Sequence, residues 1–319
     1  MRSETGNANR KAMEQPQPSA PRPAEHRGRG IALRIGGLSL FAAMMAAFKY
    51  ASLNGTNPAE ILFYRNFFSF PTILLWVLVS GGFASVRTNR PGAHAARSGL
   101  GLAVMLCTFL ALSMLPLAEA TVINFSAPLF ATLLSALFLK ERVLWHRWGA
   151  IVVGLAGVLI VVRPGGASLP ALGVAIALMA AMGAATVTVT LRQIGQTESA
   201  TATVFWFNTA GLIATALPMP FLFQFHTPAV WVALTLGGLL GGIAQIMITA
   251  SVRYAPVSAL APFDYLQIVW AMIWGLVLFD TFPAWSSIIG AALIGAAGCY
   301  VIWRERKART LVVPSPNEL

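Results

Sequence analysis

The sequence predicts an all-α integral membrane protein with ten transmembrane helices, arranged as two inverted repeats of five helices each. Of its 319 residues, 57% are hydrophobic and only 10% are charged, whereas about a quarter of the residues in soluble domains are charged. Ten apolar stretches of about twenty residues follow one another, and that length crosses a hydrocarbon core of about 30 Å. The two halves end on a similar glycine spacing, at Gly149, Gly154 and Gly157 and at Gly290, Gly295 and Gly298.

The individual spans lie between Pro, Gly or charged residues that interrupt the apolar runs. In the first half they cover 31–53, 60–80, 96–116, 118–139 and 147–163. In the second half they cover 170–191, 200–223, 230–250, 256–279 and 284–303. We therefore expect a first repeat at 31–164 and a second repeat at 170–304. Residues 1–30 are rich in Pro, Arg, Glu and Gln and predict a disordered tail, and 305–319 form a second tail.

The distribution of Lys and Arg predicts the orientation, because these residues accumulate in short cytoplasmic loops. With the N-terminus inside, 19 of the 22 Lys and Arg residues lie on the cytoplasmic side, one lies outside and two lie within spans. Both termini are therefore predicted to be cytoplasmic. The net charge of +11 comes from loops on one membrane face, so we expect a lipid bilayer and not a nucleic acid as the partner of these charges.

The two halves align residue by residue with an offset of 140, which pairs Pro116 with Pro256 and Phe125 with Tyr265. Each half has an odd number of spans, so the second copy enters the membrane from the opposite side. Inverted repeats can exchange conformations and open a central site to each side in turn. The alternative is that duplication only builds a larger bundle.

Full charges inside spans mark candidate binding residues, because an unpaired charge in lipid costs a few kcal/mol or more. Lys49, Arg65 and Asp264 qualify, whereas Glu60 and Glu119 are expected at outer ends that water reaches. The guanidinium of Arg65 suits a carboxylate or phosphate, and we predict that it anchors the substrate rather than serving only as a structural partner. Lys49 either lines the cavity or extends to the lipid headgroups. About 10 Å along the membrane normal separates these cations from Asp264, so no ion pair is predicted.

Asp264 aligns with Asn124 across the repeat, which places a carboxylate and an amide at related positions of one cavity. In a low dielectric Asp264 could carry a coupling proton or hold a cationic group, or it could only order the start of a helix. Two aromatic residues can stack on a substrate: Trp206, aligned with Arg65, and Tyr265, beside Asp264. Polar wall residues are expected from Asn124, Gln245 and Gln267, among others. Glycine-rich helix faces allow close packing and would also allow a homodimer.

Several protein classes lack support in the sequence. No phosphate-binding G-x-x-x-x-G-K-[ST] loop is present for a pump that hydrolyses ATP. The four His residues are scattered, and no Cys pair has metal-ligand spacing. Cys107 and Cys299 lie inside predicted spans of different halves and are expected to pack as small apolar groups. We therefore expect neither an enzyme nor a resident cofactor or metal.

The chain resembles the drug/metabolite transporter superfamily, specifically its bacterial EamA-type branch with ten helices. The resemblance covers about residues 31–305 and rests on four stretches: 63–66 (FYRN), 125–128 (FSAP) with 140–142 (KER), 262–267 (PFDYLQ) and 290–306, which ends in WRER. The second half departs from the family pattern at Ile268, which stands where the first half has Pro128, and at Asp280, where many members have Glu. Because proline kinks a helix, we expect the two halves to bend differently.

This resemblance implies a secondary active transporter in the bacterial inner (plasma) membrane. The expected substrate is a small polar or amphipathic metabolite, amino-acid-like or cofactor-like, such as S-adenosylmethionine or riboflavin. Alternatives are an exporter of an amino acid, an opine metallophore or a drug, and a membrane receptor or scaffold that does not transport.

Overall fold

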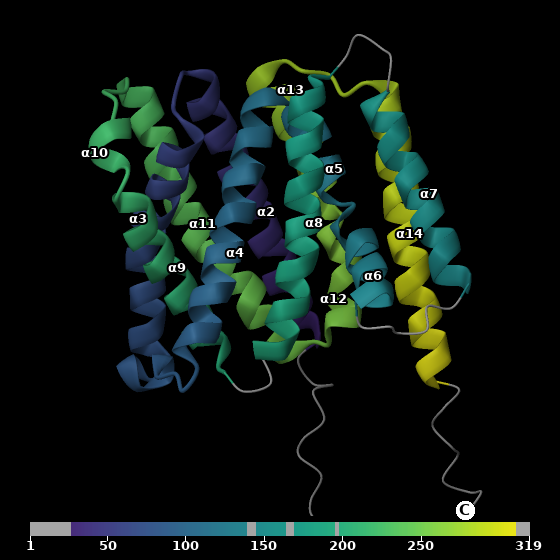
Figure 1. Cartoon of the computed structure of the whole chain (residues 1–319), viewed down its shortest axis with the longest axis horizontal. Coiled ribbons are helices and arrows are strands. Elements are labelled where there is room, and N and C mark those ends of the chain that lie inside the picture. The colour runs from purple at the N-terminus through teal and green to yellow at the C-terminus, as the bar shows by residue number, and fades with distance from the viewer. Residues whose placement is uncertain (1–26, 139–144, 164–168, 195–197, 311–319) are drawn as a thin grey trace, which may run out of the picture.

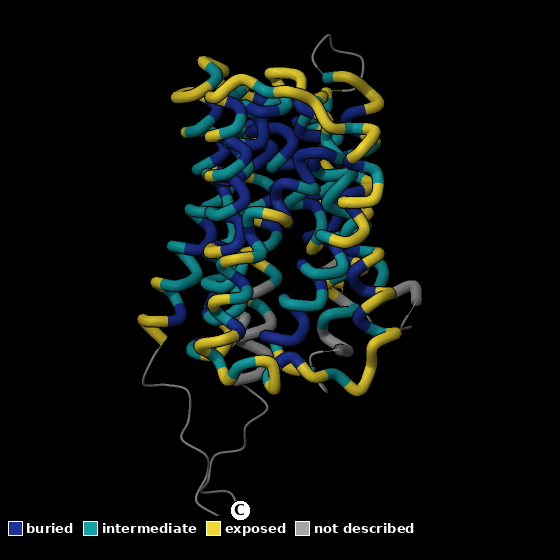
Figure 2. Tube along the Cα trace, turned by 90° about the vertical axis from the view of Figure 1, so that its left-hand side faces the viewer, coloured by how far each residue is buried: buried dark blue, intermediate teal, exposed yellow. Residues whose placement is uncertain are grey.

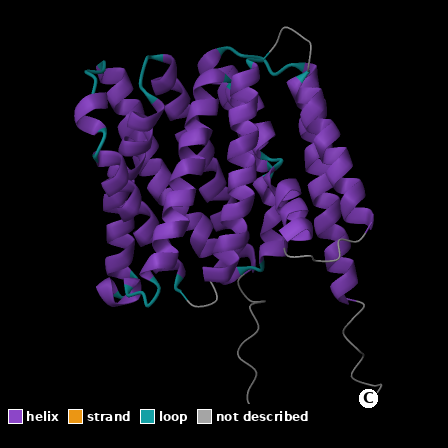
Figure 3. Cartoon of the chain, in the orientation of Figure 1, coloured by secondary structure: helices purple, strands orange, loops and turns teal. Residues whose placement is uncertain are grey.

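The computed structural model describes residues 27–138, 145–163, 169–194 and 198–310. Every regular element in these ranges is helical, as Figure 3 shows. Most of the tails predicted at 1–30 and 305–319, and the 140–142 motif, lie outside the described residues. The first described helix begins at Arg27 and the last one ends at Thr310, so both helices extend several residues past the predicted spans.

In its described residues the first repeat contains six α-helices, two of which divide one apolar stretch between them, and Figure 1 shows their arrangement. A short 3-10 helix, η1 (Gly82–Val86), connects the second span to the third. The helices are α2 (Arg27–Leu53), α3 (Pro58–Val79), α4 (Pro91–Met114), α5 (Leu117–Asn124), α6 (Ala127–Phe138) and α7 (Trp145–Val162). Pro58 and Pro91 start α3 and α4, where the missing N–H of proline has no partner to lose.

The second repeat has the same order of helices and is broken at the same place. A single additional turn, α10 (Met219–Leu222), follows its second span. The remaining helices are α8 (Ala171–Ile194), α9 (Ala200–Ala216), α11 (Pro228–Tyr254), α12 (Val257–Asp264), α13 (Leu266–Phe279) and α14 (Trp285–Thr310). Seven spans in the described ranges are long and apolar enough to cross a membrane, counting α5 with α6 and α12 with α13 as single spans.

The contacts between the two repeats are reciprocal. The first helix of one repeat lies along the third helix of the other, which gives the pairs α2 with α11 and α8 with α4. The helices α3 and α9, the second of each repeat, pack on each other. The helices α7 and α14, the last of each repeat, also pack on each other (Figure 1). Such reciprocal contacts indicate that an approximate twofold axis relates the repeats.

The fourth span of each repeat breaks at equivalent residues. The helix α5 ends at Asn124, α12 ends at Asp264, and the rings of Phe125 and Tyr265 follow these ends and lie 5.3 Å apart. Both halves therefore break at this position, whereas a difference in the angle of the bend stays a prediction. Although Ile268 replaces the proline of the first half, the second half still breaks, and Pro262 lies inside α12 just before the break.

The buried core is concentrated in the half of the bundle opposite the termini (Figure 2). It gathers residues such as Phe48 near the end of α2, Ile61 near the start of α3 and Leu112 near the end of α4. Glycines bring the fifth helices together at the edge of the bundle, because a Cβ at Gly290 would overlap the backbone of Gly157. More residues are thus buried in the half of the bundle opposite the termini than in the half from which the termini extend.

Candidate functional site

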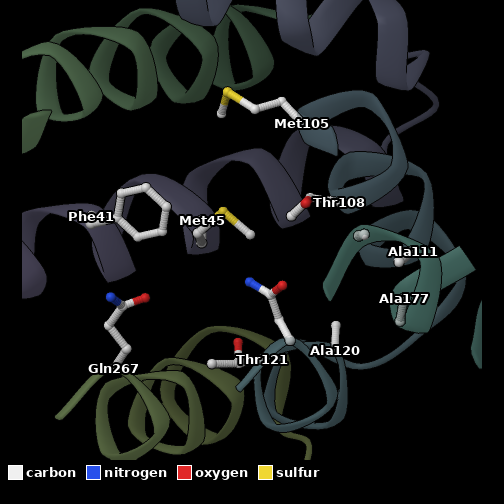
Figure 4. A pocket seen from close by; sticks show the side chains of 11 residues that line it. Phe41, Met45, Met105, Thr108, Ala111, Ala120, Thr121, Ala177 and Gln267 are labelled. Carbon is white, nitrogen blue, oxygen red and sulfur yellow. The ribbon is translucent and has the colours of Figure 1, made fainter. Parts of the chain in front are cut away.

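A cavity of about 110 Å³ lies where the two repeats meet. Figure 4 shows its walls, which come from α2, α4, α5, α8 and α13. Phe41, Met45 and Met105 form apolar walls, and Figure 4 shows the amide of Gln267 directed across the cavity toward α2. Unbranched methionine side chains can adapt to ligands of different shape.

Each repeat contributes one amide side chain to this cavity, Asn124 from α5 and Gln267 from α13. Oδ1 of Asn124 is buried without a hydrogen-bond partner, and within the described chain Gln267 has none either. The hydroxyl groups of Thr108 and Thr121 instead donate to carbonyls of their own helices, at 2.9 and 2.7 Å. Because a buried acceptor without a partner is unfavourable, the two amides are the groups of the cavity that are free to bind a polar solute.

Asp264 forms an ion pair that the sequence analysis did not predict. Arg34 of α2 donates from Nε to Oδ1 at 2.6 Å and from Nη2 to Oδ2 at 2.7 Å. The two side chains are 16% and 29% exposed. Asp264 also lines a second cavity, of about 240 Å³, together with Tyr265 and residues of α6, α7 and α14. Both carboxylate oxygens are therefore occupied by a guanidinium from the first repeat.

Lys49 is buried and does not extend to the membrane surface. Its Nζ donates to the carbonyls of Leu112 and Leu115, at 2.7 and 2.8 Å. These carbonyls lie at the end of α4, where the last residues of a helix have no partner within the helix and a cation is favoured. Lys49 also lines an open cavity of about 380 Å³ beside the junction of α4 and α5. In this structure Lys49 therefore connects α2 to the junction of α4 and α5.

Arg65 lies outside the central cavity and is 3% exposed. Its Nη1 donates to Oδ1 of Asn66 at 3.0 Å, and its guanidinium lies 5.6 Å from the ring centre of Phe207. A second arginine, Arg97 of α4, lies over the same ring at 4.3 Å. The structure thus brings Arg65 together with Arg97 and does not bring it together with Asp264.

The aromatic candidates lie at separate places. Tyr265 packs at the helix break beside Phe125, and its hydroxyl fills the space that Gly298 leaves open. Trp206 donates from Nε1 to the carbonyl of Val86 at 2.9 Å, and this hydrogen bond connects α9 to η1. Gln245 lies half-buried in α11, away from the lining of the central cavity. The structure does not bring these residues together around one ligand.

The expected exposure of the two outer carboxylates is wrong. Glu60 is fully buried, and its Oε1 lies 2.8 Å from Nε2 of His226. Glu119 is 7% exposed and accepts a hydrogen bond from Oγ of Ser287 at 2.8 Å. Each acid therefore pairs through Oε1 with a side chain of the second repeat, whereas Oε2 of Glu60 is buried without a partner.

Two arginines that matter in the structure, Arg34 and Arg97, are among the 19 Lys and Arg residues that the sequence analysis assigned to the cytoplasmic side. Arg34 lies inside the first apolar run, about two turns from the start of α2. Arg97 lies about two turns into α4 because that helix begins at Pro91. Two signals could have identified them: a proline at a helix start, and the need of a buried acid such as Asp264 for a cation at the same depth.

These features define an all-helical, multi-pass membrane protein with a duplicated bundle and a cavity between its halves. A sequence profile of the EamA-like transporter family matches residues 28–163 and 171–304. The chain therefore belongs to the EamA-like transporter family.

Its relatives include transporters with named solutes. An S-adenosylmethionine uptake transporter of Rickettsia bellii is 29% identical over 252 residues, which cover 78% of this chain and 85% of the relative. The pseudopaline exporter CntI of Pseudomonas aeruginosa is 29% identical over 285 residues, covering 87% and 97%. A solved crystal structure has the same fold, with a TM-score of 0.62 at 20% identity over 88% of this chain and 99% of that one.

Proposed function

We propose that this protein is a secondary active transporter that moves a small polar or amphipathic metabolite across the bacterial inner membrane by alternating access. In this proposal ten spans form two inverted five-helix repeats, at 31–164 and 170–304, and both termini are cytoplasmic. The observation that carries the proposal is the cavity between the repeats, to which each repeat contributes one free amide, Asn124 and Gln267. Transporter sites commonly lie at such a repeat interface near the middle of the membrane.

The packing of the bundle supports alternating access. The contacts between the repeats are reciprocal, because each repeat places its first helix against the third helix of the other. If the two repeats exchanged their conformations, the bundle would therefore have similar packing but would open on the other side of the membrane. The core is dense in the half opposite the termini, whereas the ion pair of Arg34 with Asp264 lies in the other half and is partly exposed. A protein that is closed at its outer end and looser at its inner end has the form expected of an inward-facing state.

The solute is proposed to be amino-acid-like or cofactor-like. Relatives are named for S-adenosylmethionine and for pseudopaline, and the central cavity offers amides, thioethers and one aromatic ring to a neutral or zwitterionic group. A cavity of this size requires the repeats to move apart when a larger metabolite binds. Five other residues stay proposed contacts of the solute at other steps of the transport cycle, namely Lys49, Arg65, Tyr265, Trp206 and Gln245.

A coupling proton would act at Asp264 in this proposal. Arg34 occupies both carboxylate oxygens in the present state, so a proton binds only after the pair opens. Opening would also separate α2 of one repeat from α12 of the other, which links protonation to movement of the repeats. A homodimer through glycine-rich faces is part of the same proposal.

Solute flux in proteoliposomes tests the transport function. The purified protein is reconstituted and loaded with unlabelled S-adenosylmethionine, riboflavin, amino acids or an opine metallophore, and counterflow of the labelled compound is followed. We expect saturable flux for one of these compounds. Absence of flux for every compound, with a correctly inserted and folded protein, would contradict the proposal.

Substitutions of the two cavity amides test the site. Asn124→Ala and Gln267→Ala each remove about one hydrogen bond to the solute, so we expect the KM to rise about fivefold to tenfold. Asn54→Ala is the matched control, because Asn54 is exposed at the end of α2. Equal flux in all three variants would remove the central cavity from the transport path.

A further inference from the structure

Two arginines meet one aromatic ring at a junction of three helices outside the central cavity. Phe207 of α9 lies 5.6 Å from the guanidinium of Arg65 on α3 and 4.3 Å from that of Arg97 on α4. The helices α3, α4 and α9 pack on one another. Gly101 permits this arrangement, because a Cβ there would lie 2.8 Å from the ring of Phe207.

Both arginines are buried and have donor atoms without partners. Arg65 is 3% exposed and Arg97 is 7% exposed. Nε of Arg65 and both Nε and Nη1 of Arg97 make no hydrogen bond. The side-chain contacts of Arg65 are Oδ1 of Asn66 and the Phe207 ring. In the described part of the chain, no carboxylate lies within ion-pair distance of either guanidinium.

The nearby acid is already engaged. Glu198, at the entrance to α9, lies 3.3 Å from Nε2 of His94, which precedes Arg97 by one turn of α4. Hydroxyl groups at the same junction are also buried without partners, namely those of Ser98 on α4 and Thr209 on α9. The junction therefore contains two positive charges and unused donors, and no carboxylate among the described residues pairs with either guanidinium, since the nearby acid, Glu198, lies beside His94.

Such a junction is unfavourable without a counterion. A guanidinium stays protonated in proteins, so it cannot become neutral when it is buried as a lysine or a carboxylate can. Removing one partner from a buried ion pair is strongly destabilising, because the remaining charge has lost its hydration. The ring of Phe207 offsets part of this cost, since a cation–π contact is attractive but weaker than a buried ion pair. The remaining cost favours binding of an anion.

We propose that Arg65 and Arg97 hold a small anion, a halide or a carboxylate, at the junction of α3, α4 and α9. The planar donors of two guanidinium groups suit either ligand. The anion is a free inorganic ion or the carboxylate of the transported solute, and both sources present the same chemistry to the two arginines. This site is separate from the central cavity, whose lining includes neither arginine.

Thermal unfolding of the purified, full-length protein in detergent tests the site without any need for transport. The protein is unfolded at constant ionic strength in sodium HEPES, whose sulfonate is bulky, and then with increasing sodium chloride or sodium formate. We expect a saturating rise in Tm, of about 5 °C at one hundred times the Kd. An identical Tm in all three salts would overturn the proposal.

Variants assign the effect to the junction. Arg97→Gln keeps much of the side-chain length and removes one charge, so it should abolish the rise in Tm or increase the Kd for formate at least tenfold. Arg97→Lys keeps the charge and should retain a weaker anion dependence, which separates loss of the site from loss of the fold. The control is Arg90→Gln, at the exposed start of the same helix, which should respond as the native protein does. A full response in Arg97→Gln would also overturn the proposal.

The source of the anion is decided by flux. Competition of formate with solute uptake supports the carboxylate of the solute as the natural ligand, whereas an anion-dependent Tm with unchanged uptake supports a bound inorganic ion. Because unfolding reports the anion site and counterflow reports transport, failure of one proposal is distinguishable from failure of the other.

Discussion

Breaking the pair of Arg34 and Asp264 should destabilise the protein, and removing both charges should restore part of the loss. Asp264→Asn leaves the guanidinium of Arg34 half-buried without a carboxylate, and Arg34→Gln leaves the carboxylate of Asp264 without its two donors. The double variant removes both charges and keeps two polar side chains of similar shape. The comparison of these variants isolates the interaction between the two residues.

The magnitude follows from the geometry. Hydrogen bonds to charged groups contribute about 1.5–3 kcal/mol each, and loss of one partner from a buried pair costs about 3–5 kcal/mol. The side chains are 16% and 29% exposed, so water compensates part of the loss. We expect each single variant to lose about 2 kcal/mol of unfolding free energy, and the coupling free energy to be about 1–2 kcal/mol.

Denaturant or thermal unfolding of the purified variants in one detergent measures these values. Arg87→Gln is the control, because Arg87 is exposed in the loop after η1, and it should change the unfolding free energy by less than about 0.5 kcal/mol. Additive effects of the two single variants, with a coupling below about 0.3 kcal/mol, would refute the interpretation that this pair holds the repeats together.

Three further predictions concern other parts of the bundle. Lys49→Met should lower the unfolding free energy by about 2 kcal/mol, because two carbonyls at the end of α4 lose a charged donor; an unchanged Tm would contradict this role. Gly290→Ala should cost about 1–3 kcal/mol through overpacking against α7, whereas Gly99→Ala, where the space is open, should be neutral or stabilising; unfolding curves compare the two. Burial opposes ionisation of Glu198, but hydrogen bonds from His94 and neighbouring groups outweigh it and lower its pKa. Ionised Glu198 therefore stabilises the folded protein fully above its pKa in the unfolded chain, about 4.3, and this stabilisation is lost as the pH falls through the lower pKa of the folded protein. Glu198→Gln should therefore make the unfolding free energy depend less steeply on pH in acid. An equally steep dependence would contradict this assignment.

Much of the fold could be predicted because lipid imposes a simple rule on the sequence. A helix must be apolar over about 20 residues to cross the hydrocarbon core, so apolar runs indicated where helices lie. The ends were less predictable, and α2 begins at Arg27, before the predicted start of its span. Helix ends depend on local capping and on the depth of the membrane; prolines such as Pro91 signal some helix starts, whereas the depth of the membrane leaves no direct signal in the sequence.

The candidate site could be predicted only in part. Asn124 and Gln267 were expected as polar wall residues, and they lie in one cavity. The partners of the charged residues could not be predicted, because Arg34 and Asp264 are 230 positions apart. A sequence indicates the depth of a charge in the membrane but not the direction in which its side chain points around the helix axis.

The sequence by itself determined the class of protein, the duplication and the presence of charged residues such as Lys49 and Arg65 within apolar stretches, because composition and periodicity follow directly from the cost of placing polar groups in lipid. The tertiary structure decided which charges meet. It pairs Asp264 with Arg34, places Lys49 on the carbonyls at the end of α4, and brings Arg65 and Arg97 to one ring. These contacts depend on how the helices of the two repeats rotate and cross when they pack, and that arrangement is a property of packing between distant segments.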